Sequence, residues 1–214
     1  MVIFIDLDDT LYPPNSGMWQ AIMNRIELFM VDKMKFPLEE VPKIRAHLFR
    51  QYGTTLRGLQ TEYRVNTLDY LQFVHDVPLR RYIQPDPVLE KALKTIPHRK
   101  VIFTNADVHH ARRVLDVLGL TGCFEEIIDI VSIAPWCKPQ REAFELAMDI
   151  AGAQDVSDCI LVDDAESNID AASALGFKTV KVGNGSGQSQ ADVVIPIASH
   201  LPEAILKILP REDG

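Results

Sequence analysis

Three acidic side chains stand within four positions at the end of an apolar run. Residues 2–5 are apolar, and Asp6, Asp8 and Asp9 follow them directly. Like charges gathered at the end of a buried segment repel one another and lose hydration. A protein tolerates such an arrangement where a cation lies among the acids or where the acids carry out a reaction. The spacing therefore predicts a cation site, a catalytic site, or both.

Other polar groups recur after apolar runs that are typical of strands. Besides residues 2–5, the predicted strands are 101–103, 127–131, 160–162 and 179–182. The polar groups that follow them, or lie just beyond, are Thr104, Asn105, Lys138, Asp163 and Asp164. In an open α/β sheet the carboxyl ends of the strands share one edge, where ligands bind. These side chains are therefore expected to meet the first acids in space.

The alternation of apolar runs with amphipathic segments predicts an α/β fold. Its core is a parallel sheet with helices on both faces, because the strands are continuously apolar. One region breaks the rhythm: residues 15–83 contain helical patterns and no convincing strand. We interpret these residues as an inserted helical domain, called here the cap segment, and residues 1–14 and 84–214 as the core. The polar run at residues 183–190 is interpreted as a flexible loop.

Carboxylates at a shared edge favour a magnesium site. Asp6, Asp8 and the pair Asp163 and Asp164 supply the oxygen ligands that Mg²⁺ prefers, and the ion offsets their repulsion. Mg²⁺ is thus the expected cofactor.

A base and neutral donors complete a predicted phosphate site. Lys138 contributes a positive charge, and Thr104 and Asn105 contribute hydrogen-bonding groups. Asp6 is then the expected nucleophile, which forms an aspartyl-phosphate that water hydrolyses. Asp8 is expected to protonate the leaving oxygen and later to deprotonate the water. That task predicts a raised pKa for Asp8, through burial and a neighbouring carboxylate.

Four motifs in order resemble those of the haloacid-dehalogenase-like (HAD) phosphohydrolase superfamily. They are DLDDTL (6–11), FTNA (103–106), CKP (137–139) and LVDDAESN (161–168). The resemblance implies a Rossmann-like core, Mg²⁺ dependence and the two-aspartate mechanism.

The resemblance also implies individual roles. Asp8 would bind the metal through its carbonyl, Asp164 would bind it directly, and Asp163 would act through water. Lys138 would steady the phosphate and the nucleophile. Dehalogenase members lack the second acid of the first motif, so Asp8 indicates phosphate chemistry.

The cap segment resembles the C1 type of subfamily IA, inserted between the first two motifs. Within it, YGTTLRGL (52–59) and VNTLDYLQFVH (65–75) look like the pyrimidine 5′-nucleotidase branch. That branch would imply release of phosphate from UMP or CMP. Arg57 is the cap base expected to reach the substrate, with a solvated position as the alternative.

Four other residues have less defined expectations. Asp9 is expected to be solvated or to cap a helix or a turn, and His109 to lie on a solvated face. A position lining the site is considered for His110. Asn168 either holds a loop by hydrogen bonding or lies on a helix surface.

Rival functions stay open at this point. They are a phosphosugar phosphatase or phosphomutase on the same fold, a phospho-accepting signalling module, and an inactive binding protein. The net charge of −8 argues against a nucleic acid polymer as partner. No apolar stretch approaches the length of a membrane span, and three cysteines without a signal peptide favour the cytoplasm. A small phosphorylated metabolite is the expected partner, and the oligomeric state is left open.

Overall fold

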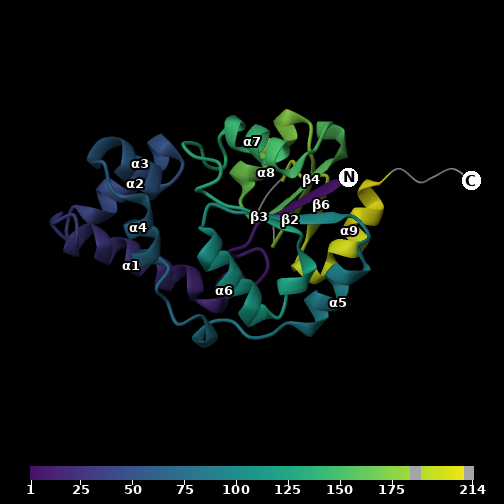
Figure 1. Cartoon of the computed structure of the whole chain (residues 1–214), viewed down its shortest axis with the longest axis horizontal. Helices are drawn as coiled ribbons and strands as arrows, with labels where there is room; N and C mark the ends of the chain where they lie inside the picture. Colours follow the sequence, from purple (N-terminus) through teal and green to yellow (C-terminus); the bar gives the residue numbers. More distant parts are fainter. Residues whose placement is uncertain (184–188, 210–214) are drawn as a thin grey trace, which may run out of the picture.

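A parallel sheet lies at the centre of the fold (Figure 1). The structure is a computed structural model that describes residues 1–183 and 189–209. Within these residues, six strands pair in parallel in the order β3-β2-β1-β4-β5-β6. The strands are β1 (Val2–Ile5), β2 (Arg99–Phe103), β3 (Glu126–Ile128), β4 (Cys159–Asp163), β5 (Lys178–Val182) and β6 (Val193–Ile195).

Helices cover both faces of the sheet because its strands alternate two buried sets of side chains. Ile3 and Ile5 belong to one apolar cluster, and Val2 and Phe4 belong to the other. The first cluster includes residues of α5 (Pro87–Thr95), α6 (Val108–Leu118) and α9 (Leu201–Ile208). The second includes residues of α7 (Arg141–Ala151) and α8 (Glu166–Leu175). The predicted fold class is confirmed (Figure 1).

The cap segment is helical, and it lies to one side of the sheet (Figure 1). Its helices are α1 (Met18–Asp32), α2 (Val41–Tyr52), α3 (Thr55–Tyr63) and α4 (Thr67–Val74). The structure describes all of residues 15–83, and no strand occurs among them. The side chains of Thr54 and Asn66 accept hydrogen bonds from the main chain of the first turns of α3 and α4. These caps satisfy amides that a helix start leaves without a partner.

Short 3₁₀ turns complete the connections. They are η1 (Pro14–Ser16), η2 (Leu79–Arg81), η3 (Thr121–Cys123), η4 (Val156–Asp158) and η5 (Ala198–His200). β3 ends at Ile128, three residues before the predicted end of this strand. β6 was not predicted, and the polar run at 183–190 falls largely outside the described residues. Among the helices described, none is both long enough and apolar enough to cross a membrane.

Candidate active site

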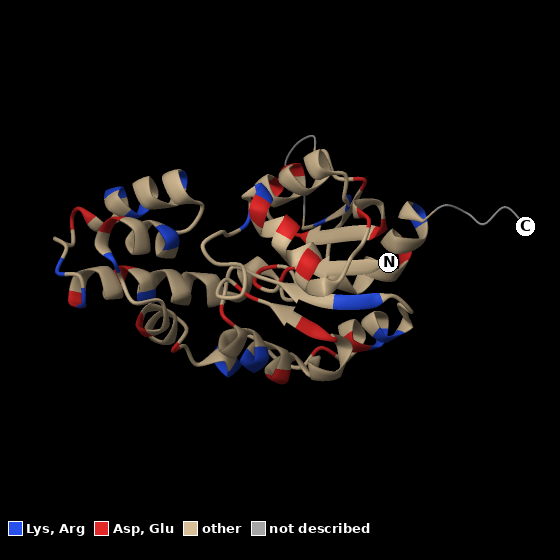
Figure 2. Ribbon diagram, turned by 45° about the horizontal axis from the view of Figure 1, so that its top comes forward, with Lys and Arg blue, Asp and Glu red and all other residues tan. Residues whose placement is uncertain are grey.

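The strand order brings the predicted polar groups to one edge of the sheet. Asp6 follows β1, Thr104 follows β2, and Asp163 is the last residue of β4. β1 pairs with both β2 and β4, so the ends of these three strands are neighbours. Lys138 arrives from the loop between β3 and α7. Figure 2 shows acidic segments on the loops between the sheet and the cap segment.

The ammonium group of Lys138 joins two of the carboxylates. Its Nζ donates to Asp6 Oδ1 and to Asp163 Oδ2, both at 2.7 Å. The Lys138 side chain is almost fully buried. Burial alone lowers the pKa of a lysine, but Asp163 and Asp6 outweigh it and raise the pKa of Lys138. The lysine therefore stays charged and compensates part of the negative charge at this edge.

Neighbouring side chains fix Lys138 and Asp163, which are bonded to each other. Asn105 Nδ2 donates to the carbonyl of Lys138 at 3.0 Å, and Asn105 Oδ1 accepts from its amide at 2.9 Å. Asn168 Nδ2 lies 3.0 Å from each oxygen of Asp163, and the amide of Ala165 donates to the same carboxylate. Asn168 thus takes the loop-holding position of its two interpretations. Asn105 positions the lysine loop and keeps one amide N–H for a ligand.

Three carboxylates fit a divalent cation. One oxygen each of Asp6, Asp163 and Asp164 lies within 4.8 Å of the others. Burial raises the pKa of Asp6 well above its usual value; Lys138 opposes this, and the two other acids add to it. Burial, with Asp163, also raises the pKa of Asp164. Ionised acids in this position call for more positive charge than Lys138 provides, and hard oxygen donors suit Mg²⁺.

Asp8 contacts two other side chains, Tyr12 and His110. Its Oδ1 accepts from the hydroxyl of Tyr12 at 2.6 Å and lies 2.9 Å from Nε2 of His110. Burial raises the pKa of Asp8, but the attraction and hydrogen bond of His110 and the bond from Tyr12 outweigh it, so the pKa is lowered. The predicted raised pKa of Asp8 was wrong, because its neighbours stabilise the charged form.

Asp9 is neither fully solvated nor a cap. It is half-buried with φ at 60°, and within the described residues its Oδ1 is buried with no hydrogen-bond partner. Burial, with Asp164 and Asp8, raises the pKa of Asp9 to about 6.

A cavity of about 480 Å³ connects the acids to the cap segment. Its volume lies in the usual range for small-molecule sites, about 300–1,000 Å³. The catalytic wall of the cavity consists of Asp6, Asp8, Thr104, Asn105, Lys138 and Asp164. The cap wall includes Trp19, Met23, Arg45, Phe49 and Tyr70.

Arg57 differs from its expected position. Its guanidinium is buried and does not line the cavity. Its Nη2 donates to the carbonyls of Ile130 at 2.5 Å and Trp136 at 2.6 Å, and its Nη1 donates to Gln60 at 3.0 Å. Arg57 therefore ties α3 to the loop that carries Lys138 rather than contacting a substrate.

Sequence reasoning missed Arg45 as a candidate cap residue and considered His110 only as a minor possibility. Arg45 lies one turn before the apolar Leu48 on α2, and nothing in its local pattern separates it from a solvated arginine. His110 lies 102 positions from Asp8, so only the packing of α6 against the first loop reveals their contact.

The chain matches a protein family and a yeast protein by sequence. The profile of the family described as "Hydrolase: haloacid dehalogenase-like hydrolase" matches residues 1–176. Phosphate metabolism protein 8 of Saccharomyces cerevisiae is 27% identical over 190 residues, which are 82% of this chain and 59% of that protein. The chain thus spans less than two thirds of this relative's length.

Solved structures share the fold at low sequence identity. A HAD phosphatase from Thermococcus onnurineus has a TM-score of 0.64 and 14% identity, covering 95% of this chain and 97% of its own. A β-phosphoglucomutase from Clostridium difficile has a TM-score of 0.62 and 17% identity, with 97% and 96% covered. A 2-haloacid dehalogenase from Pseudomonas syringae has a TM-score of 0.61 and 19% identity, with 97% and 99% covered.

Proposed function

Since the chain belongs to the haloacid dehalogenase-like hydrolase family, we propose that it is a Mg²⁺-dependent phosphomonoesterase that forms an aspartyl-phosphate on Asp6. The observation that carries the proposal is the meeting of Asp6, Asp163, Asp164 and Lys138, three of which (Asp6, Asp164 and Lys138) line the 480 Å³ cavity. The presence of Asp8 on the same wall favours phosphate over halide chemistry.

In the first half-reaction, a carboxylate oxygen of Asp6 attacks phosphorus. The bond from phosphorus to the leaving oxygen breaks, and that oxygen takes a proton from Asp8. In the free protein the pKa of Asp8 is lowered, so Asp8 gains this proton when the negatively charged substrate binds, because the added negative charge favours the protonated acid. Lys138 holds Asp6 in place and contributes positive charge, and Thr104 and Asn105 lie beside the incoming phosphate.

In the second half-reaction, water attacks the phosphorus of the aspartyl-phosphate. The water gives one proton to Asp8, and the bond from phosphorus to Asp6 breaks, which restores both carboxyl groups to their first state. Asp6, Asp164, the carbonyl of Asp8 and, through water, Asp163 would hold Mg²⁺, which when bound supplies charge neutralisation for the transferring phosphoryl group.

For the substrate, we propose a pyrimidine nucleoside monophosphate, UMP or CMP. The cap wall supports this choice, because it offers the aromatic side chains of Trp19 and Phe49 and the guanidinium of Arg45. Aromatic faces suit a base ring, and a guanidinium suits ring carbonyl oxygens. The name of the yeast relative, a phosphate metabolism protein, agrees with phosphate release in general terms.

We further propose that residues 15–83 act as the cap domain and that the protein works in the cytoplasm. The separate placement of α1–α4 supports the first, and the three free cysteines support the second. A cap over the cavity would exclude water during phosphoryl transfer.

The test is phosphate release from a panel of nucleotides and sugar phosphates, with Mg²⁺ and with a chelator in its place. We expect UMP and CMP to lead the panel, and activity to disappear with the chelator and return with Mg²⁺. Asp6→Asn should lower the rate by about 10⁴-fold or more, since it removes the nucleophile. Sugar phosphates in the lead would reject the nucleotide substrate, and an active Asp6→Asn variant would reject the mechanism.

A further inference from the structure

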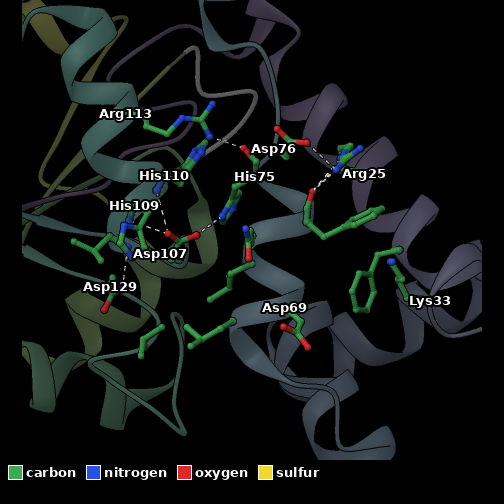
Figure 3. A pocket seen from close by; sticks show the side chains of 17 residues that line it. Arg25, Lys33, Asp69, His75, Asp76, Asp107, His109, His110, Arg113 and Asp129 are labelled. Carbon is green, nitrogen blue, oxygen red and sulfur yellow. Dashed lines mark hydrogen bonds and ion pairs between the residues drawn. The ribbon is translucent and has the colours of Figure 1, made fainter.

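Two buried histidines lie in contact beside Asp8. His110 belongs to α6, and His75 follows the last turn of α4. Their rings stack with centroids 4.2 Å apart and planes 22° apart. Figure 3 shows the pair, with Asp107 directed toward His75. Buried polar rings cost hydration unless they are bonded, so their hydrogen bonds indicate what they do.

Among the described residues, the ring of His110 has one hydrogen-bond partner, which is Asp8. Nε2 of His110 lies 2.9 Å from Asp8 Oδ1. A carboxylate only accepts, so Nε2 carries the hydrogen in this network. Nδ1 of the same ring is buried and, among the residues described, has no hydrogen-bond partner. The His110 ring is thus oriented toward Asp8 alone.

His75 is fixed at both its side chain and its main chain by the same helix. Its Nδ1 lies 2.5 Å from Asp107 Oδ2, and Asp107 also caps α6 by accepting from the amides of His109 and His110. Arg113, one turn further along α6, donates to the carbonyl of His75 at 2.9 Å (Figure 3). The ring that covers His110 therefore cannot rotate freely.

From this geometry we propose that His110 is a positioning residue for Asp8, and that His75 and Asp107 hold the His110 ring in place. Asp8 can rotate about its side-chain bonds, and Tyr12 alone gives it a single donor. The second donor, from His110, restricts the carboxylate to one orientation. The inference rests on the proposed function, in which Asp8 transfers the proton in both half-reactions.

If His110 positions Asp8, removing the His110 donor should impair turnover but not substrate binding. A carboxyl group displaced by about 1 Å from its productive position can cost about 10²-fold in rate. Loss of the His110 donor should therefore lower kcat, while the KM for the substrate stays unchanged. Both half-reactions need Asp8, so both should slow together, and the ratio of their rates, on which KM depends, should stay unchanged.

The decisive comparison is His110→Gln with His110→Leu, assayed with UMP and Mg²⁺. The amide of Gln can donate to Asp8, whereas Leu fills a similar volume without a donor. We expect His110→Leu to lose about 10- to 100-fold in kcat at constant KM, and His110→Gln to recover most of that loss. His109→Leu is the matched control, because His109 is the exposed neighbour on the same helix; it should behave as wild type.

Thermal unfolding separates positioning from folding. If His110→Leu fails to fold, His110→Asn replaces it, because the shorter side chain does not reach Asp8. Equal kcat values for the variants with and without a donor would overturn the inference while leaving the proposed function intact. A wild-type protein that releases no phosphate from any member of the panel would instead overturn the proposed function.

Discussion

The two walls of the cavity are built on different principles. On the catalytic wall, the side chain of Lys138 is almost fully buried and donates to carboxylate oxygens of Asp6 and Asp163. On the cap wall, Trp19 and Phe49 are 44% and 61% exposed. A bonded, buried wall holds atoms in fixed positions, whereas a wall with exposed aromatic side chains can adapt to what binds there.

The difference between the two walls is clearest when Arg45 of the cap wall is compared with Lys138 of the catalytic wall. Its Nε is buried, and within residues 1–183 and 189–209 it has no hydrogen-bond partner; the nearest acid is Glu27 at 3.7 Å. Lys138 has two carboxylates at 2.7 Å. Two cationic side chains line one cavity. Lys138 is saturated by two carboxylates. Arg45, in contrast, has one long ion pair with Glu27 and a weak bond from Nη1 to the sulfur of Met23 at 3.2 Å, so its remaining N–H groups are available to a ligand. Under the proposed function, Lys138 would serve the reaction and Arg45 would serve substrate recognition.

The largest effect should follow from removing the saturated cation. Lys138→Met leaves Asp6 and Asp163 buried without their shared partner. We expect kcat to fall about 10³-fold and the free energy of unfolding to fall by about 3–5 kcal/mol. Phosphate release and thermal unfolding measure the two effects, with the exposed Lys91→Met as control. A small loss of rate in a folded variant would contradict the assigned chemistry.

A smaller and more selective effect should follow from removing the available cation. Arg45→Ala should lower kcat/KM for UMP by about 10- to 100-fold, the value of one or two charge-assisted hydrogen bonds. Hydrolysis of glycerol phosphate, which does not reach the cap wall, should stay within about twofold on the same argument. The exposed Arg50→Ala on the same helix is the control. Equal losses with both substrates would remove the distinction between the walls.

The smallest effect concerns the packing behind the cap wall. A Cβ at Gly58 would lie 2.6 Å from Cβ of Leu48 and 3.0 Å from a ring carbon of Tyr52, so α2 and α3 leave no room for it. Gly58→Ala should destabilise the protein by about 1–3 kcal/mol through overpacking. Activity at low temperature should persist, because the catalytic wall is untouched. Gly122→Ala, where a Cβ meets open space, is the control for the unfolding measurement.

The sequence predicts the catalytic wall well because local patterns decide it. Apolar runs locate β1, β2 and β4, and parallel pairing places Asp6, Thr104 and Asp163 at one edge. The three-residue β6 was missed because its pattern is too short to distinguish from a loop.

The contacts of the cap segment could not be predicted in the same way. Arg57 was assigned to a substrate because its charge is visible in the sequence, whereas its partners are carbonyls 73 and 79 positions away. The pKa of Asp8 was predicted in the wrong direction for a similar reason, since His110 approaches from another helix. Side-chain partners of this kind depend on how helices dock, and one helix's pattern does not contain that information.

The buried guanidinium of Arg57 has a mechanical consequence. Arg57 belongs to α3 of the cap segment, and its guanidinium donates two hydrogen bonds to the carbonyl of Trp136, two positions before Lys138. A movement of the cap segment that widens the cavity entrance must either break these hydrogen bonds or rotate α3 about them. Because this carbonyl belongs to the loop that carries Lys138, a movement of α3 would be transmitted to the lysine.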